Sequence, residues 1–385
     1  MASRFNQAVL PLKGFDIKTI NTPNVSPLVT FTKINSLEKL LYIGSLDGKL
    51  STFSTNNKNL TLQNTYNVSS PPVSILHPTD AQMLILGVGQ IHPNEQQEGR
   101  VFQIDKANNQ SLPQVNMLKR PVYFTSSDEG KTDMLICEYG YQKGQLSYYK
   151  KENNRWQGQI LSDTAGATKA LPYDFNKDGL TDFAVLWAQG DERVTFYYAQ
   201  KNGGFQAKQV LQFPPIYGSS DIQLVDFDKN GTMDMLYTNG DNEDFSVVLK
   251  PYHGVRVFLN DGKDNFREGV FYPMHGAFQA KAADFDNDGD MDIVTTSFFP
   301  SDKTKPEAHF RYLEQTQPFQ FKAYTFKEAT QGKWMTLDVG DADGDGDMDI
   351  LLGSFVISLA GNSKSVDKKD TVLPFLFLEN NIKKN

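Results

Sequence analysis

Short runs of apolar, β-branched and aromatic residues follow one another along the whole chain, and turns rich in glycine, asparagine and aspartate separate them. Examples are Leu40–Gly44, Met83–Leu86 and Phe183–Leu186. Runs of this length and composition predict β-strands. Because few stretches keep the period of an amphipathic helix over several turns, the pattern predicts an all-β fold.

An acidic turn stands directly before the strand-like run Ile350–Gly353. In Asp341–Asp349 a carboxylate occupies every second position, and Gly346 stands at position six. A calcium loop has this spacing: oxygen ligands come from alternate positions, a backbone carbonyl comes from position seven, and the glycine allows the sharp turn. Carboxylates packed so closely repel one another unless a cation binds. The turn therefore predicts a calcium site, with an acidic surface turn as the alternative.

The same pattern occurs three more times upstream. Successive loops begin at Asp174, Asp226, Asp284 and Asp341, which are 52, 58 and 57 residues apart. A period of about 50 residues is typical of a repeat array. The predicted ligands, for up to four Ca²⁺ ions, are Asp174, Asn176, Asp178, Leu180, Asp182, Asp226, Asp228, Asn230, Thr232, Asp234, Asp284, Asp286, Asp288, Asp290, Asp292, Asp341, Asp343, Asp345, Asp347 and Asp349.

Helical calcium motifs do not fit these loops. An EF-hand needs a glutamate at the twelfth position and a helix on each side. Thr295 and Leu352 hold that position in the last two loops, and the flanking runs are rich in β-branched and aromatic residues. Each loop is therefore predicted to join two strands.

The loops, their strand context and their period resemble FG-GAP/VCBS repeats, which are the blades of integrin-type β-propellers. The resemblance covers residues 165–381 and is weaker before them. Pro251–Gly262 and Ser297–Pro300 resemble a bacterial, uncharacterised subgroup of VCBS-repeat proteins. The resemblance implies a secreted or surface-attached protein of adhesion or carbohydrate handling, although a fold alone does not supply a function.

We expect one domain over residues 1–385: an all-β, seven-bladed β-propeller with calcium-binding loops between the first two strands of blades 4–7. Blade three carries a degenerate loop, Thr125–Asp133, which is expected to keep the same turn without a metal. Blade seven lacks a fourth strand, and an N-terminal strand at residues 12–20 is predicted to pair there and close the ring. Six blades remain the alternative. The predicted blades are residues 28–66, 70–117, 120–163, 167–212, 220–272, 278–326 and 333–381.

The net charge and the number of cysteines limit the expected partners, disulfides and location of the protein. The net charge of −8 argues against nucleic acid and anionic membranes as partners. The single cysteine, Cys137, allows no intrachain disulfide and is expected to be buried in a strand. Loops of this type in extracellular modules bind calcium too weakly to fill in cytosol, so we expect a secreted, periplasmic or cell-surface location. Neither a membrane span nor a signal peptide is evident, and we expect that an export or lipoprotein signal has been removed.

Long links between strands locate a candidate ligand surface. Strand alternation places the calcium loops and the hairpins between the third and fourth strands on one face of a propeller, and the other connections on the opposite face. Long loops on a rigid scaffold often carry function, and the links of blades five to seven are long. The candidate ligand-binding residues there are Tyr252, His253, Tyr272, His275, Phe298, Phe299 and Trp334.

Three functions remain open for this surface. The first is recognition of carbohydrate or a protein partner by a non-catalytic module, which we favour. The second is a polysaccharide lyase of the propeller type, in which Tyr or His acts as the base. The third is a purely structural scaffold.

Overall fold

The computed structural model describes residues 8–19, 26, 28–55, 59–240, 248–356 and 372–382. Seven sheets account for nearly all regular structure, and only two short 3₁₀ helices, η4 (Pro306–Ala308) and η5 (Lys327–Gln331), are named among the described residues. These sheets are the blades of a seven-bladed β-propeller, which confirms the predicted all-β class. No described helix has the length and apolar character needed to cross a membrane.

The chain divides into two compact units. One comprises residues 1–45, 51–65 and 222–385, and the other comprises residues 46–50 and 66–221. The boundary between them passes through three strands: β5 (Lys49–Ser54), β6 (Thr61–Asn67) and β19 (Ser219–Val225).

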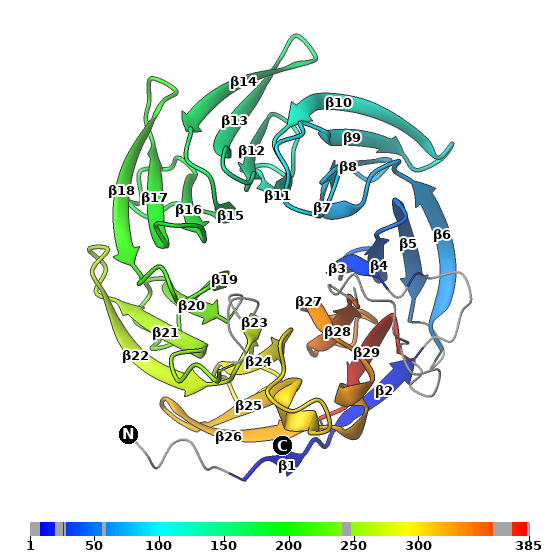
Figure 1. Ribbon diagram of the computed structural model, residues 1–385, viewed down its shortest axis with the longest axis vertical. Coiled ribbons are helices and arrows are strands. Elements are labelled where there is room, and N and C mark those ends of the chain that lie inside the picture. Colours follow the sequence, from blue (N-terminus) through cyan, green and yellow to red (C-terminus); the bar gives the residue numbers. More distant parts are fainter. Residues whose placement is uncertain are drawn as a thin grey trace. The chain divides into compact units, whose positions relative to one another are not determined.

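The first unit holds blades one, five, six and seven (Figure 1). Blade one is β3 (Val29–Asn35), β4 (Leu40–Ser45), β5 (Lys49–Ser54) and β6 (Thr61–Asn67); blade five is β19 (Ser219–Val225), β20 (Asp234–Asn239), β21 (Gly254–Asn260) and β22 (Phe266–Pro273); blade six is β23 (Ala277–Ala283), β24 (Asp292–Ser297), β25 (Phe310–Gln317) and β26 (Gln320–Thr325); blade seven begins with β27 (Trp334–Gly340), β28 (Asp349–Ser354) and β29 (Phe375–Asn380).

The second unit holds blades two, three and four. They are β7 (Pro72–Thr79), β8 (Gln82–Gly87), β9 (Gly99–Asp105) and β10 (Gln110–Leu118); β11 (Pro121–Thr125), β12 (Asp133–Glu138), β13 (Gln145–Glu152) and β14 (Arg155–Ser162); and β15 (Ala167–Tyr173), β16 (Asp182–Trp187), β17 (Arg193–Ala199) and β18 (Phe205–Gln212). Cys137 lies buried in β12.

The N-terminal segment contributes a strand to each of the last two blades. β2 (Phe15–Thr19) pairs antiparallel with β29 as the fourth strand of blade seven, visible in Figure 1 as a blue arrow beside the red strand. β1 (Leu10–Pro11) adds to β26 of blade six in parallel, which the sequence did not predict. Residue 20 of the predicted strand 12–20 lies outside the described residues. The closure of a ring stays a prediction.

The second strand of a blade forms its core. β16, β20, β24 and β28 are buried at every position. Strands buried on both faces are commonly rich in apolar residues. Apolar residues dominate β16 and β28, whereas β20 and β24 bury several polar side chains as well. Fourth strands such as β18 are largely exposed, and their residues alternate only weakly between more buried and more exposed positions. The buried strand follows the acidic loop directly in blades four to seven, and its position fixes where the loop lies.

A β-bulge interrupts the pairing of the first two strands at nearly the same place in most blades. The register shifts between the first and third residues of the first strand of the blade, which we call the inner strand. A bulge of this kind bends the strand and increases its twist. The shifts lie at Val29/Phe31, Pro72/Ser74, Pro121/Tyr123, Ala167/Lys169, Ala277/Gln279 and Trp334/Thr336.

Polar side chains on the inner strands of the first unit clamp neighbouring blades together. Each bonds to the backbone of the inner strand of the next blade, so that sheet edges inside the protein keep partners. Gln223 binds both the N–H (2.7 Å) and the C=O (3.1 Å) of Ala282, Gln279 accepts from the N–H of Leu337 (2.6 Å), and Asp338 accepts from the N–H of Ile34 (2.8 Å).

Candidate metal centres

The last aspartate of each acidic loop ties the loop to the third strand of its blade. Asp182, Asp234, Asp292 and Asp349 are fully buried. In each, Oδ2 accepts the N–H of the second loop residue, and Oδ1 accepts an N–H near the end of the third strand. The donors to Oδ2 are Phe175, Phe227, Phe285 and Ala342 (2.9–3.3 Å), and the donors to Oδ1 are Ala199, Asn260, Gln315 and Asn380 (2.8 Å each).

The first aspartate of each loop holds the turn in shape. Asp284 illustrates the pattern: its two oxygens accept the N–H groups of Asp288 (3.1 Å) and Gly289 (3.0 Å). The glycine at position six has a φ between 82° and 92° in all four loops. A Cβ built on Gly346 would meet no atom within 4 Å, so the backbone conformation and not space requires glycine there.

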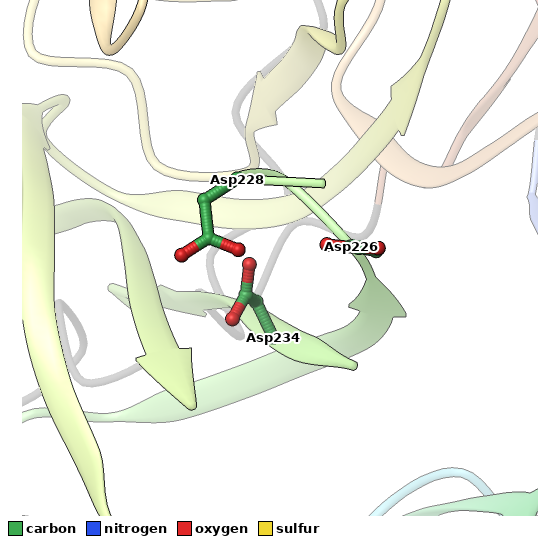
Figure 2. Close-up of side chains that lie close together, drawn as sticks. All are labelled: Asp226, Asp228 and Asp234. Atoms are coloured by element: carbon green, nitrogen blue, oxygen red, sulfur yellow. The ribbon is translucent and has the colours of Figure 1, made fainter. Parts of the chain in front are cut away.

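Carboxylates converge in three of the four loops. Ligand atoms within 4.8 Å of one another come from Asp226, Asp228 and Asp234 in blade five, from Asp284, Asp286 and Asp288 in blade six, and from Asp341, Asp343 and Asp345 in blade seven. Figure 2 shows the carboxylates of Asp228 and Asp234 facing each other across the blade-five loop. Convergence of oxygen atoms without a neutralising group is the geometry that a hard cation requires.

The blade-four loop is less acidic. Asn176 replaces an aspartate at position three, and its Nδ2 donates to Asp178 at 3.0 Å. Asp174 accepts the N–H groups of Asp178 (3.1 Å) and Gly179 (2.9 Å), as the first aspartates do in blades five and six. The turn is therefore the same, while part of the charge repulsion is replaced by a hydrogen bond.

Burial, with repulsion by neighbouring carboxylates as a smaller cause, raises the pKa values of several loop carboxyl groups. Burial raises the pKa of Asp292 to about 7 and that of Asp349 to about 8. Burial, followed by the charge of Asp345 beside it, raises the pKa of Asp347. Among the described residues, Oδ1 of Asp347 and Oδ1 of Asp290 are buried without a hydrogen-bond partner. A bound cation would remove both the repulsion and the missing partner, so the residues fit the predicted ion.

In the degenerate loop of blade three, hydroxyl groups donate hydrogen bonds to the last aspartate of the loop. Ser126 and Ser127 both donate to Asp133, at 2.8 Å and 2.5 Å, and Tyr148 donates to it at 3.2 Å. The left-handed residue beside the glycine is Glu129, at position five, whereas the full loops place it at position four. The turn is thus related to the others and not identical to them.

The structure separates the predicted ligand-binding residues into buried and surface groups. Trp334 is 0% exposed, and its indole N–H donates to the carbonyl of Ala329 at 2.8 Å. His253 is 1% exposed, its Nδ1 accepts the N–H of Gly276 at 3.3 Å, and burial lowers its pKa to about 3. Neither side chain presents a surface to a ligand, which corrects the expected patch at these two positions.

The remaining patch residues are half-buried and engaged with neighbours. Tyr272 accepts a hydrogen bond from Arg311 at 2.9 Å. The ammonium group of Lys333 lies 3.7 Å from the ring centre of Phe298 and 4.9 Å from that of Phe299, a cation–π arrangement. These contacts fit the structural alternative as well as the binding one.

Tyr252 and His275 both pack against the buried imidazole of His253. The ring centre of His253 is 5.2 Å from each of the two rings. Nδ1 of His275 accepts the N–H of Lys250 at 3.4 Å. Half of the blade-five link, residues 241–247, and most of the blade-seven link, residues 357–371, fall outside the described residues.

Two asparagines at the ends of third strands escaped the sequence reasoning. Nδ2 of Asn260 donates to the carbonyl of Met233 at 3.1 Å, and Nδ2 of Asn380 donates to that of Met348 at 3.2 Å. Both carbonyls directly precede the last loop aspartate. The available signal was the pair of Asn residues closing β21 and β29.

A hollow of about 340 Å³ opens beside the blade-five loop. Its lining includes Asp228 and Asn230 of the loop, the hairpin residues Asp261 and Asn265, and Arg267. Sequence reasoning placed the candidate ligand surface on the other connections and did not find this hollow.

Comparison with solved structures supports the fold. The chain is similar to the Pan2 WD40 domain of Neurospora crassa (TM-score 0.60, 11% identity, 98% of each chain covered). It is also similar to the N-terminal domain of Nup159 (TM-score 0.54, 10% identity, 97% of each chain). A putative 6-phosphogluconolactonase from Bacteroides fragilis gives a TM-score of 0.55 at 12% identity, with 82% of this chain and 96% of that chain covered. At such identities the likeness extends to the fold alone.

Sequence comparison identifies the repeats. No curated protein sequence matches the chain. The model of the FG-GAP-like repeat family matches residues 174–237 and 238–295, which contain the loops of blades four, five and six. The match to FG-GAP-like repeats and the seven blades together support an FG-GAP β-propeller family for this chain.

Proposed function

We propose that this protein is a calcium-stabilised β-propeller that serves outside the cytoplasm as a binding or scaffold module. The observation that carries the proposal is the convergence of carboxylates in the loops of blades five, six and seven, with ligand atoms within 4.8 Å of one another. Without a cation, this arrangement raises the free energy of the folded state through like-charge repulsion.

The donor set favours calcium over transition metals. The loop side chains that converge offer oxygen atoms only, and oxygen donors suit Ca²⁺ and Mg²⁺, whereas zinc and copper prefer nitrogen and sulfur. The ligand spacing follows that of calcium loops, which accept six to eight oxygens in flexible geometry. Ca²⁺ would neutralise the carboxylates and tie the loop to the buried strand behind it.

Removal of the ion tests this function. Purified protein stripped of metal should unfold at a lower temperature than the same protein with millimolar Ca²⁺, because the ion binds only the folded state. Millimolar Mg²⁺ is the control and should restore less stability, since it demands a smaller octahedral site. An unchanged melting temperature after metal removal, with no calcium detected by calorimetry, would contradict the proposal.

Ligand binding by the blade-five link is a second candidate function. Val248 and Leu249, between β20 and β21, are 69% and 61% exposed, and Lys250 and Tyr252 follow them. Two adjacent apolar side chains beside a cation and an aromatic ring suit a protein surface or a sugar face. The partner expected for this candidate is still a carbohydrate or a protein. The centre of the proposed binding surface lies at Val248 and Leu249 and not at Trp334.

Arrays of glycans and peptides test the second candidate. A hit should weaken when Val248 and Leu249 are both replaced by serine. Leu37→Ser is a matched control, because Leu37 is 97% exposed in the link between β3 and β4. Equal loss in both variants would indicate non-specific apolar adhesion.

The lyase alternative lacks support from His253. A general base must come within hydrogen-bonding distance of the proton that it removes, and a 1% exposed imidazole does not reach a polymer. The net charge of −8 further disfavours binding of polyanionic chains without bound calcium.

A further inference from the structure

We propose that the side chain of Asp347 is a direct ligand of the ion in the blade-seven loop, and that Asp290 has the same role in blade six, so that these two loops bind calcium more tightly than those of blades four and five. The inference rests on the proposed calcium function and deepens it. Position seven ordinarily supplies a backbone carbonyl to such an ion, so a side-chain ligand there is an addition.

The environment of Asp347 carries the argument. Its side chain is only 9% exposed, and among the described residues its Oδ1 has no hydrogen-bond partner. Its backbone N–H donates to Oδ1 of Asp345 at 3.1 Å, which keeps it beside the cluster of Asp341, Asp343 and Asp345. An unpaired buried carboxylate oxygen is costly. A cation among these four carboxylates gives that oxygen a partner.

Lys39, a cation beside this loop, does not fill that role. Its side chain is exposed, and its ammonium group donates to the backbone carbonyl of Asp343 at 2.9 Å. This bond engages the backbone of the turn and not a carboxylate oxygen of the cluster.

Blade six repeats part of the arrangement, although Asp290 is only partly buried and its side chain also lies within hydrogen-bonding distance of Gln315. Asp290 holds position seven, and its Oδ1 is likewise buried without a partner among the described residues. The carboxylates of Asp284, Asp286 and Asp288 have ligand atoms within 4.8 Å of one another. The same orphaned atom at the same position in two loops points to a shared ligand.

Blades four and five lack this group. Leu180 holds position seven in blade four. Thr232 holds it in blade five, where its hydroxyl donates to Oδ1 of Asn230 (2.5 Å) and to the carbonyl of Asn260 (3.2 Å). Positions one, three, five and seven thus offer four carboxylates in each of blades six and seven and two in each of blades four and five. Affinity for calcium rises with the number of charged ligands.

Calorimetric titration of the metal-free full chain with CaCl₂ tests the proposal. The wild-type protein should bind in two phases, with two tight sites and weaker ones after them. Asp347→Asn, which keeps the shape and removes the charge, should weaken one tight site about tenfold or more. Asp302→Asn removes the same charge from an exposed link of blade six and should leave both phases unchanged.

Thermal unfolding distinguishes the loss of a calcium ligand in Asp347→Asn from a simple folding defect. In metal-free buffer Asp347→Asn should melt no lower than wild type, because an unpaired buried charge is removed. With millimolar Ca²⁺ it should melt below wild type. Leu180→Asp adds the missing carboxylate to blade four and should tighten a weak site.

Two results would overturn the inference. Wild-type affinity at every site in Asp347→Asn would show that the side chain is not a ligand, while the calcium function would stand. Four equal sites in the wild-type protein would contradict the division into two classes. Absence of any calcium binding by the wild-type chain would overturn the proposed function, and this inference with it.

Discussion

The carboxylate of Asp349 accepts the backbone N–H of Asn380 at 2.8 Å and thereby joins the acidic loop of blade seven to β29. Its other oxygen accepts the N–H of Ala342 at 2.9 Å. A residue that the sequence suggests as a metal ligand is therefore also a fully buried bracket between two strands. The equivalent aspartates of the other three full loops make the same pair of bonds.

Replacement of this bracket should destabilise the protein with or without an ion. Asp349→Ala leaves the N–H groups of Ala342 and Asn380 buried without an acceptor, which we expect to cost about 3 kcal/mol. Urea unfolding in metal-free buffer measures the loss. Asp345→Ala is the comparison, because Asp345 is exposed and its removal should lower stability only when Ca²⁺ is present. Equal behaviour of the two variants in both buffers would contradict the separate roles.

Stability of the metal-free protein should fall as the pH rises. Burial raises the pKa of Asp292 to about 7 and that of Asp349 to about 8, above the ordinary value of 3.8. Between these values the native state binds more protons than the unfolded state, so the stabilisation present below pH 4 is lost as the pH passes through 7 to 8. Urea unfolding at pH 5 and pH 8 after removal of metal by a chelating resin checks the direction. Ca²⁺ should reduce the difference, and a rise in metal-free stability with pH would contradict it.

The glycine at position six should be required for its backbone conformation. Gly346→Ala places a side chain at a φ of 92° where no neighbouring atom lies within 4 Å, so any loss measures strain and not a clash. We expect about 1–2 kcal/mol by urea unfolding. Gly204→Ala in the blade-four hairpin is the control, since its φ is not in the left-handed region. A loss of the same size there would remove the conformational explanation.

The clamp between blades five and six should contribute measurable stability. Gln223→Ala removes two hydrogen bonds to the backbone of Ala282 and leaves that buried peptide group without partners, at a cost of about 1–3 kcal/mol. Gln206→Ala, on the exposed strand β18, removes the same side chain without such bonds and should be nearly neutral. Chemical denaturation of both variants in saturating Ca²⁺ provides the comparison. Similar stabilities would show that the clamp is energetically unimportant.

Local patterns made most of the fold predictable. The acidic loops and the apolar runs behind them are contiguous in sequence, so their turn geometry and the buried strands followed from spacing alone. The bracket role of Asp349 was not predictable, because its partner Asn380 lies 31 residues away on another strand. Burial of Trp334 was missed for a different reason: a bulge between Trp334 and Thr336 shifts the strand alternation that would have assigned its face.

Small structural additions were also invisible in the sequence. β1 has only two residues, and it pairs with β26 through backbone groups that any sequence can offer. The hydroxyl groups of the blade-three loop were seen as missing carboxylates, whereas Ser126 and Ser127 take over the hydrogen bonds that hold the turn.

The pairing of β2 with β29 has a consequence for the order of folding during synthesis. Lys18 forms an ion pair with Glu379 at 2.5 Å across 361 residues of chain. β2, the fourth strand of the last blade, is thus synthesised well before its partner β29. Contacts of such high sequence separation form slowly because a long loop must close first. Until β29 has been made, β2 has no edge to join, and the growing chain carries an unpaired strand that chaperones can recognise.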